Sequence, residues 1–302
     1  MSSYPAGAPP LAPSQAKTTH WTLREKKQRG EPITALTAYD YPTARLLDEA
    51  GIDIVLVGDS VAMAVLGHES TLSLTMDEML HHAKAVKRGV KSALLVVDMP
   101  YGSYHTTDDD AVRNALRLVQ EGGAEAVKLE GGAHRAPLVE RLTRAEIQVV
   151  GHIGLTPQSL NRMGGYRVQG RSIPEIEKLL TDAVALEAAG AIALVLEGIP
   201  REVAARITAA AGIPTIGIGA GPDCDGQILV FHDLVRLGFG AVAKFVRPFT
   251  DAGTTIRFAV DQYRHAVESR TFPNDAESYH LGTAVRAELD HTAVDQTALQ
   301  SI

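Results

Sequence analysis

The chain has 302 residues, of which 29 are Lys or Arg and 36 are Asp or Glu, so its formal net charge is −7. This balance argues against a nucleic-acid-binding protein and against a basic membrane-binding patch, both of which need clustered positive charge. The composition, 45% hydrophobic and 22% charged, is typical of a globular protein with a large core. A single cysteine, Cys224, excludes an intramolecular disulfide and a zinc ribbon.

The two ends of the chain differ from its middle. The first twenty residues contain four prolines and no continuous apolar stretch, so we expect residues 1–22 to form a disordered tail without a secretory signal. Residues 23–272 are expected to form one catalytic domain, with a helix at about 251–268, and residues 273–302 a C-terminal helical extension. No apolar run approaches the roughly 20 residues that a membrane-spanning helix needs.

The middle of the chain repeats one structural unit. A helical segment ends at a glycine, which fits the left-handed position that closes a helix, and a short apolar run rich in β-branched residues follows. DEAGIDIVLVGD and EAAGAIALVLEG are examples. Strands are expected within eight segments: 33–38, 48–59, 87–98, 120–132, 147–154, 187–198, 213–221 and 236–246.

Strands that alternate with helices in this way predict an α/β fold, a single-domain (β/α)₈ TIM barrel. A doubly wound open sheet is the alternative, because a count of strands does not show that the sheet closes. Two helix starts support the assignment. Thr75 and Glu78 form a capping-box pattern before a helix at 76–88, and Pro174 suits the first turn of a helix at 174–189.

Side chains along the predicted strands alternate in size. In AIALVLE, at 191–197, small residues and Glu197 share one face, whereas the bulky aliphatic residues share the other. Residues 124–130 show the same order, with Lys128 and Glu130 on the face of the small residues. We expect this face to line the barrel lumen, so that the last polar residue reaches the carboxyl end of the strand, where barrel enzymes place their chemistry.

Three acidic residues, Asp59, Asp98 and Glu130, occupy the ends of consecutive predicted strands. Carboxylates without several accompanying histidines are ligands that Mg²⁺ prefers, and Mg²⁺ keeps open positions for substrate oxygens. We therefore expect a magnesium site at this end of the barrel. The alternative for each residue is that it caps the next helix or pairs with a Lys or Arg.

Other polar residues at strand ends have several possible roles. Lys128 is a candidate to hold a substrate carboxylate, although a Schiff-base nucleophile and an ion pair with Glu130 or Asp98 are alternatives. Glu197 is a candidate general base, with an arginine pair as its structural alternative. Ser60 and His152 also fall at strand ends. Residues 156–172 lack apolar periodicity and contain three glycines, which is typical of a mobile lid.

The glycine-rich run GIGAG, at 217–221, has two explanations. Its backbone amides can bind a phosphate, or its glycines can permit close packing.

These residues and motifs, in this order, resemble the ketopantoate hydroxymethyltransferases over about residues 30–275. One departure is Met99-Pro100-Tyr101, where the family usually has Leu-Pro-Phe after the aspartate. The segments that carry the resemblance are LTAYDYPTARLLDEAGIDIVLVGDS, VVDMPYGSY, AVKLEGG, GHIGLTPQS, GGYRVQGR, LVLEGIP and IPTIGIGAGPDCDGQILVFHD.

The resemblance implies a Mg²⁺-dependent transfer of a one-carbon unit from 5,10-methylenetetrahydrofolate to 3-methyl-2-oxobutanoate through an enolate, yielding 2-dehydropantoate for pantothenate synthesis. It further implies small-molecule substrates only, a cytoplasmic location and a homo-oligomer, by family resemblance a decamer. The site residues that the resemblance implies are Asp59, Asp98 and Glu130 for the metal, Asp59, Ser60, Asp98 and Lys128 for the substrate, and Glu197 as proton acceptor.

Three other functions fit the same pattern. A metal-dependent carbon–carbon lyase of the phosphoenolpyruvate mutase and isocitrate lyase type would act on an oxo acid without folate. A Schiff-base aldolase would use Lys128 as its nucleophile. A non-catalytic binding barrel is the least favoured, because buried carboxylates cost stability.

Overall fold

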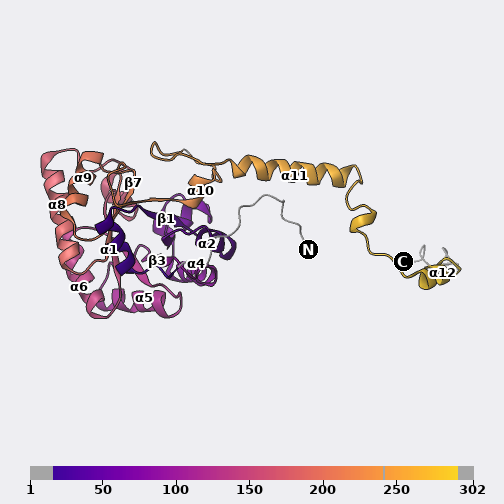
Figure 1. Cartoon of the computed structure of the whole chain (residues 1–302), viewed down its shortest axis with the longest axis horizontal. Helices are drawn as coiled ribbons and strands as arrows, with labels where there is room; N and C mark the ends of the chain where they lie inside the picture. The colour runs from indigo at the N-terminus through magenta and orange to yellow at the C-terminus, as the bar shows by residue number, and fades with distance from the viewer. Residues whose placement is uncertain (1–15, 241, 292–302) are drawn as a thin grey trace. The chain divides into compact units, whose positions relative to one another are not determined.

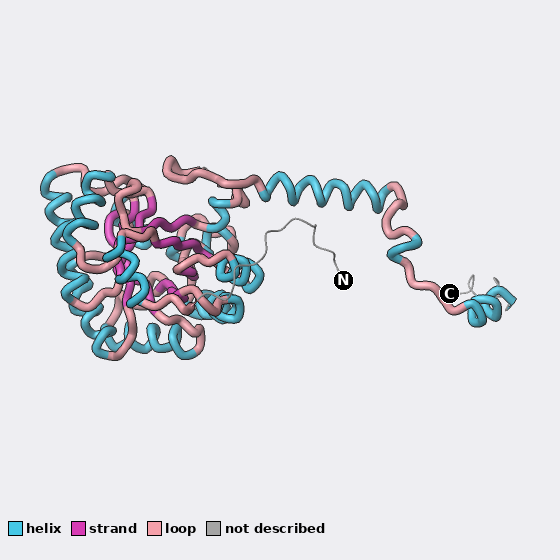
Figure 2. Tube along the Cα trace, viewed as in Figure 1, coloured by secondary structure: helices cyan, strands magenta, loops and turns pink. Residues whose placement is uncertain are grey.

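In the computed structural model, which describes residues 16–240 and 242–291, eight parallel strands form a closed barrel. They follow the chain order, and β8 pairs with β1 to complete the ring inside a layer of helices (Figure 1; Figure 2). The predicted barrel is confirmed and the open-sheet alternative is wrong. The strands are β1 Ile33–Thr37, β2 Ile54–Val57, β3 Leu94–Asp98, β4 Ala126–Glu130, β5 Val149–Gly154, β6 Ala193–Glu197, β7 Thr215–Ile218 and β8 Gly226–Leu229.

The predicted helices at 76–88 and 174–189 are confirmed as α4 and α8, within one residue at each end. The Thr75 side chain accepts a hydrogen bond from Glu78 N, and the Glu78 side chain accepts one from Thr75 N, so the capping box is complete. The helices up to residue 250 are α1 His20–Arg29, α2 Tyr41–Glu49, α3 Val61–Ala64, α4 Met76–Gly89, α5 Asp108–Gln120, α6 Ala136–Arg144, α7 Leu160–Met163, α8 Ile173–Ala188, α9 Arg201–Ala210 and α10 Phe231–Leu234.

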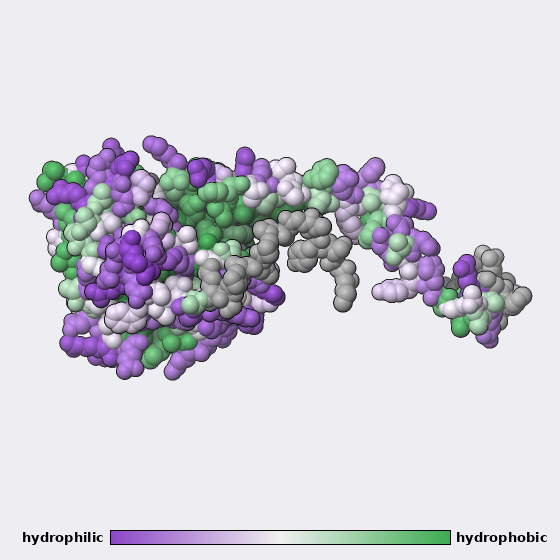
Figure 3. Space-filling model, in the orientation of Figure 1, coloured by the Kyte–Doolittle hydropathy of each residue, from purple (hydrophilic) through white to green (hydrophobic). Residues whose placement is uncertain are grey.

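The eighth strand is not the segment that we expected. Residues 226–229 form β8, which residues 219–225 join directly to β7, whereas the described part of 236–246 consists of turns and irregular structure. That segment has the same local pattern as the true strands, a glycine followed by apolar residues, but it does not pair with β1. Its Phe239 and the nearby Phe249 are exposed, and apolar residues gather around α10 in the space-filling view (Figure 3).

The core has two layers that follow the alternation of side chains along the strands. Bulky residues such as Leu194 and Leu196 pack outward with the helices, as expected. The inner layer holds small side chains from β4 and β6 and larger side chains from β2 and β3, so the strands fill the lumen to different extents. The inner layer comprises Leu23, Ile33, Ala35, Ile54, Leu56, Leu94, Val96, Ala126, Val150, Ala193, Val195, Ile216 and Ile228.

Of the expected N-terminal tail, 1–22, residues 1–15 lie outside the described residues. Beyond it the expectation is wrong, because α1 begins at His20 and Lys17 forms an ion pair with Glu125 at 2.6 Å. Leu23 of α1 is fully buried in the inner core layer. Lys26 and Lys27 bind Asp53 and Asp225, which precede β2 and β8, so α1 covers the amino ends of the strands.

The C-terminal unit, residues 251–302, is separate from the compact unit that ends at Thr250. It contains α11 Ala252–Glu268, close to the expected 251–268, and α12 Thr283–His291. None of the side chains of α11 is buried. No described helix is long and apolar enough to cross a membrane.

The position of β8 can be tested with two glycines. A Cβ at Gly226 would lie 2.4 Å from the carbonyl oxygen of Ile33, whereas a Cβ at Gly238, in the segment expected to be a strand, would have no atom within 4 Å. We expect Gly226→Ala to destabilise the protein by about 1–3 kcal/mol through overpacking and Gly238→Ala to have little effect. Urea unfolding followed by circular dichroism measures both, and equal midpoints would contradict this register.

Candidate active site

A cavity of about 380 Å³ opens at the carboxyl ends of the strands. Side chains from every strand or from the loop directly after it line the cavity. The structure places all the residues singled out from the sequence there: Asp59, Ser60, Asp98, Lys128, Glu130, His152 and Glu197.

The alternation of side chains explains why these residues converge. Asp98, Glu130 and Glu197 are each the last residue of a strand, and each stands two or four positions after a lumen residue of the same strand. His152 faces the same way in the middle of β5. Asp59 follows β2 in the turn that leads into α3. Parallel strands end at the same edge of a barrel, so these five side chains meet there.

Asp59, Asp98 and Glu130 are buried, with exposed fractions of 5%, 2% and 5%. The backbone N–H of Asp59 donates to Oδ2 of Asp98 at 2.9 Å, which ties the turn after β2 to the end of β3. Burial raises the pKa of Asp98 to about 7, and the ammonium of Lys128 opposes this rise. Burial and the charge of Asp59 raise the pKa of Glu130 well above its ordinary value. The site therefore concentrates negative charge away from water.

Lys128 is the cation that faces these carboxylates. Its Nζ lies 3.0 Å from Oδ1 of Asp98 and 3.3 Å from Nδ1 of His152. Burial disfavours the ammonium, but the negative charges of Asp98, Asp59 and Glu130 outweigh it and raise the pKa of Lys128 above its ordinary value. A Schiff-base nucleophile needs a lowered pKa, so this environment favours an electrostatic role.

His152 and Glu197 form the other side of the cavity. Nε2 of His152 lies 3.2 Å from Oε2 of Glu197, and its Nδ1 lies 3.5 Å from Oε1 of Glu130. Burial and the charge of Lys128 lower the pKa of His152, which favours the neutral imidazole. The side chain of Glu197 is 16% exposed, so this carboxylate reaches the cavity more openly than the other three.

Sequence reasoning missed two polar contacts of the site. Gln158 is buried, and its Nε2 donates to Oδ2 of Asp59 at 2.8 Å. The hydroxyls of Tyr39 and Ser60 are 2.8 Å apart, which orients Ser60. Gln158 and Tyr39 lie in loops and carry no charge at neutral pH, so no periodicity or charge pattern distinguishes them. Only their positions inside the quoted family motifs offered a signal.

The donor set fits a magnesium ion. In the part of the chain that the structure describes, no three or more His, Cys, Asp or Glu side chains are so placed that together they could hold a metal ion. However, Mg²⁺ usually binds through one or two carboxylates and fills its remaining positions with water and substrate oxygens. Among the described residues, Oε1 of Glu130 is buried and accepts no hydrogen bond, and Oδ1 of Asp98 is buried beside the Lys128 ammonium at 3.0 Å. These oxygens and Asp59 are therefore the groups that would hold the ion.

The segment 156–172 borders the cavity and is not the plain loop that we expected. It contains a short 3₁₀ helix, Pro157–Ser159, and the single turn of α7. Tyr166 lines the cavity, and its hydroxyl donates to Sδ of Met63 at 3.6 Å. Gly170 is buried against Leu179, which would crowd a Cβ at 2.7 Å, so this glycine serves packing.

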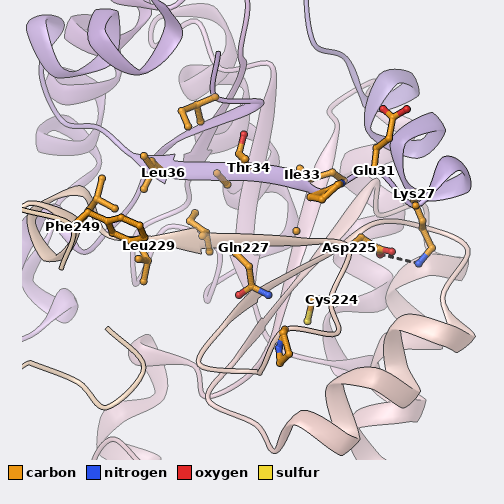
Figure 4. Close-up of a pocket in the computed structure, with 18 residues that line it drawn as sticks. Lys27, Glu31, Ile33, Thr34, Leu36, Cys224, Asp225, Gln227, Leu229 and Phe249 are labelled. Carbon is orange, nitrogen blue, oxygen red and sulfur yellow. Dashed lines mark hydrogen bonds and ion pairs between the residues drawn. The ribbon is translucent and has the colours of Figure 1, made fainter. Parts of the chain in front are cut away.

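Two other features provide no comparable chemistry. In the GIGAG run, a Cβ at Gly219 would lie 2.7 Å from Phe245, which supports the close-packing explanation. A larger cavity of about 700 Å³ runs along β1 and β8, from the ion pair of Lys27 with Asp225 to Phe249 (Figure 4). None of the site residues predicted from the sequence lines it.

Comparison with known proteins identifies the family of this chain. Residues 17–275 match the family model described as ketopantoate hydroxymethyltransferase. The chain is 60% identical over 276 residues to a 3-methyl-2-oxobutanoate hydroxymethyltransferase of Koribacter versatilis, with 91% of this chain and 94% of the relative covered. It is 52% identical to the protein of the same name from Geotalea daltonii, with 87% and 98% covered.

Solved structures show the same fold at low identity. A phosphonopyruvate hydrolase in complex with oxalate and Mg²⁺ matches with a TM-score of 0.56 and 15% identity, covering 90% of this chain and 95% of that chain. A 2,3-dimethylmalate lyase matches with a TM-score of 0.53 and 18% identity, covering 94% and 98%. The fold, the site and the sequence matches lead to one conclusion: this chain belongs to the ketopantoate hydroxymethyltransferase family.

Proposed function

We propose that the enzyme transfers a hydroxymethyl group from 5,10-methylenetetrahydrofolate to 3-methyl-2-oxobutanoate and yields 2-dehydropantoate for pantothenate synthesis. The observation that carries the proposal is one cavity in which three buried carboxylates, a buried lysine and the more exposed Glu197 face one another. A 2-oxo acid has a keto oxygen and a carboxylate that can bind at the site formed by the buried carboxylates and the lysine. It also has an acidic C3 proton that Glu197 can accept. The names of the relatives supply the identity of the acid.

In this proposal Asp59, Asp98 and Glu130 hold Mg²⁺. When bound, the ion supplies Lewis-acid stabilisation of the negative charge that develops on the keto oxygen. With all three carboxylates ionised, they and the Lys128 ammonium would carry a charge of −3 + 1 = −2, which a divalent cation would balance. Because burial raises the pKa of Asp98 and of Glu130, binding of the ion would release protons from these groups.

The remaining residues bind the oxo acid and move its proton. Lys128, with the Ser60 hydroxyl, binds the substrate carboxylate and fixes which face of the acid meets Glu197. Glu197 then accepts the proton from C3. The resulting enolate carbon forms a bond to the methylene carbon of the folate, and both carbon–nitrogen bonds that hold this carbon in the folate break. Water supplies the hydroxyl group and one proton, and Glu197 returns the proton from C3, so that each of the two folate nitrogens gains one proton. Closure of segment 156–172 keeps bulk water out until the carbon–carbon bond has formed.

The proposal also includes the cellular location and the oligomeric state of the enzyme. By family resemblance it is a cytoplasmic homo-oligomer, a decamer, that acts on small molecules. Turnover of 3-methyl-2-oxobutanoate that requires the folate donor supports the transferase. Turnover of an oxo acid or its aldol without folate would instead support the carbon–carbon lyase.

The metal part of the proposal predicts that EDTA abolishes turnover and that Mg²⁺ restores it. Mg²⁺ should also raise the thermal unfolding midpoint of the wild type, because a ligand that binds only the folded state stabilises it. Asp59→Asn and Asp98→Asn should lose both effects. Asp233→Asn, which changes a carboxylate of α10 in the same cavity, should keep them. Full activity of metal-free enzyme would contradict this prediction.

The role of Lys128 predicts different outcomes for two substitutions. Lys128→Arg keeps the positive charge and should retain part of the affinity for the oxo acid. Lys128→Ala should lose about 1.5–3 kcal/mol of binding free energy, as expected for a hydrogen bond to a charged group. Isothermal titration calorimetry measures both. Borohydride-dependent labelling of Lys128 by the oxo acid would show the aldolase instead.

The role of Glu197 can be measured without folate, because proton removal precedes carbon transfer. Wild-type enzyme with Mg²⁺ should exchange the C3 hydrogen of 3-methyl-2-oxobutanoate in D₂O, which NMR follows directly. Glu197→Gln keeps the size of the side chain but cannot accept the proton, so exchange should slow by about 10²–10⁴-fold. Unchanged exchange in this variant would assign the base elsewhere, with His152 as the next candidate.

A further inference from the structure

Gln158 is a buried residue near the start of the segment 156–172. It lies in the 3₁₀ turn Pro157–Ser159 with an exposed fraction of 6%, whereas Arg162, Arg167 and Arg171 farther along are exposed. A buried glutamine must have partners for both ends of its amide, since an unpaired buried polar group is costly. Its hydrogen-bond partners therefore indicate which groups Gln158 positions.

All of its partners belong to the site or to the loops beside it. Nε2 donates to Oδ2 of Asp59 at 2.8 Å and to the carbonyl oxygen of Met99 at 3.0 Å. The backbone N–H of Gln158 donates to Oε2 of Glu130 at 2.9 Å. Oε1 accepts from the hydroxyl of Tyr104 at 2.6 Å. One residue thus binds two of the three acidic side chains.

The pattern of these bonds leaves specific oxygens available. Gln158 occupies one oxygen of Asp59 and one of Glu130, while Oε1 of Glu130 is buried and accepts no hydrogen bond within the described part of the chain. The neutral amide orients Asp59 and the neutral backbone N–H orients Glu130, so neither carboxylate is neutralised, whereas a lysine or arginine at this position would add a positive charge. Tyr104 supports the arrangement, because its hydroxyl also accepts from the backbone N–H of Glu130 at 3.2 Å.

We propose that Gln158 is a positioning residue that holds Asp59 and Glu130 for the divalent cation and couples cation binding to the order of the segment 160–172. The inference rests on the proposed metal site. The side chain of Gln158 orients Asp59, its backbone N–H orients Glu130, and both belong to the start of the segment. A cation that orders these carboxylates therefore also orders the start of the segment. Such coupling is reciprocal, so loss of the anchor must weaken the binding of the cation.

The first measurement is the affinity for Mn²⁺, used as a spectroscopic substitute for Mg²⁺, by electron paramagnetic resonance on the full chain without substrate. Gln158→Met preserves the length of the side chain and removes the amide bonds to Asp59, Met99 and Tyr104, while the backbone bond to Glu130 remains. The Kd should rise about 10–100-fold, the usual effect of losing a residue that orients a metal ligand. Gln169→Met is the matched control. It makes the same change in the same segment, where the Gln169 amide instead donates to the carbonyl oxygen of Arg167 at 2.8 Å.

The second measurement is limited trypsin digestion at Arg162, Arg167 and Arg171, with and without saturating Mg²⁺. In wild type and Gln169→Met, Mg²⁺ should slow cleavage at these sites by about fivefold or more, within the range of ordinary coupling between sites. In Gln158→Met, Mg²⁺ should leave the cleavage rate unchanged even where it saturates the site. A residue that only stabilises the fold would alter cleavage equally in both conditions.

If Gln158→Met does not fold, Tyr104→Phe provides the test. It keeps the amide but removes the hydroxyl that binds Oε1, so the Kd for Mn²⁺ should rise about 2–10-fold, as for the loss of one hydrogen bond. An affinity within twofold of wild type in the folded variant tested, or an equal loss in Gln169→Met, would overturn the inference alone. Absence of Mn²⁺ binding by wild type would overturn it together with the metal part of the proposed function.

Discussion

The ammonium of Lys128 stands among three buried carboxylates, and the chemistry of the cavity depends on this imbalance of charge. Its contact with Asp98 at 3.0 Å offsets one negative charge. The others remain in a place where water cannot solvate them, which is why burial raises the pKa values of both Asp98 and Glu130. An arrangement of this kind costs folding free energy unless a further cation enters. In the proposed function, a divalent ion beside the fixed positive charge of Lys128 would supply that cation.

The barrel makes this concentration of charge tolerable. The inner core layer below the site is entirely apolar and is covered at its far end by α1 through Leu23. Stability thus comes from the lower lumen and the outer helices, whereas the charged groups occupy only the carboxyl end. This separation is typical of TIM barrels, whose strands can bear a reactive layer without disturbing the packed layers beneath it.

Hydrogen bonds divide the site into a fixed half and an open half. Asp59, Glu130 and Gln158 are joined to one another and to Tyr104, so their positions are determined by several loops at once. Glu197 instead contacts His152 at 3.2 Å and is partly exposed to the cavity. A fixed half suits groups that bind, and a more open carboxylate suits a group that must gain and lose a proton.

The sequence by itself predicted the alternation of strands and helices and the layer of charged residues at the strand ends, because both follow from periodicity, whereas pairing of β8 with β1 decided that the sheet closes. Glycine after a helix, a β-branched run and a polar last residue recur along the chain, and the two-residue period of a strand then places Asp98, Lys128, Glu130, His152 and Glu197 on the lumen side. Local pattern did not suffice for the last strand, since the glycine and apolar run at 236–246 predicted a strand there, whereas residues 226–229 form it. Pairing with β1 selected residues 226–229, where Gly226 allows the close approach of Ile33. Tertiary structure alone identified Gln158, because an uncharged residue in a loop acquires its role only through the buried partners that distant segments bring to it.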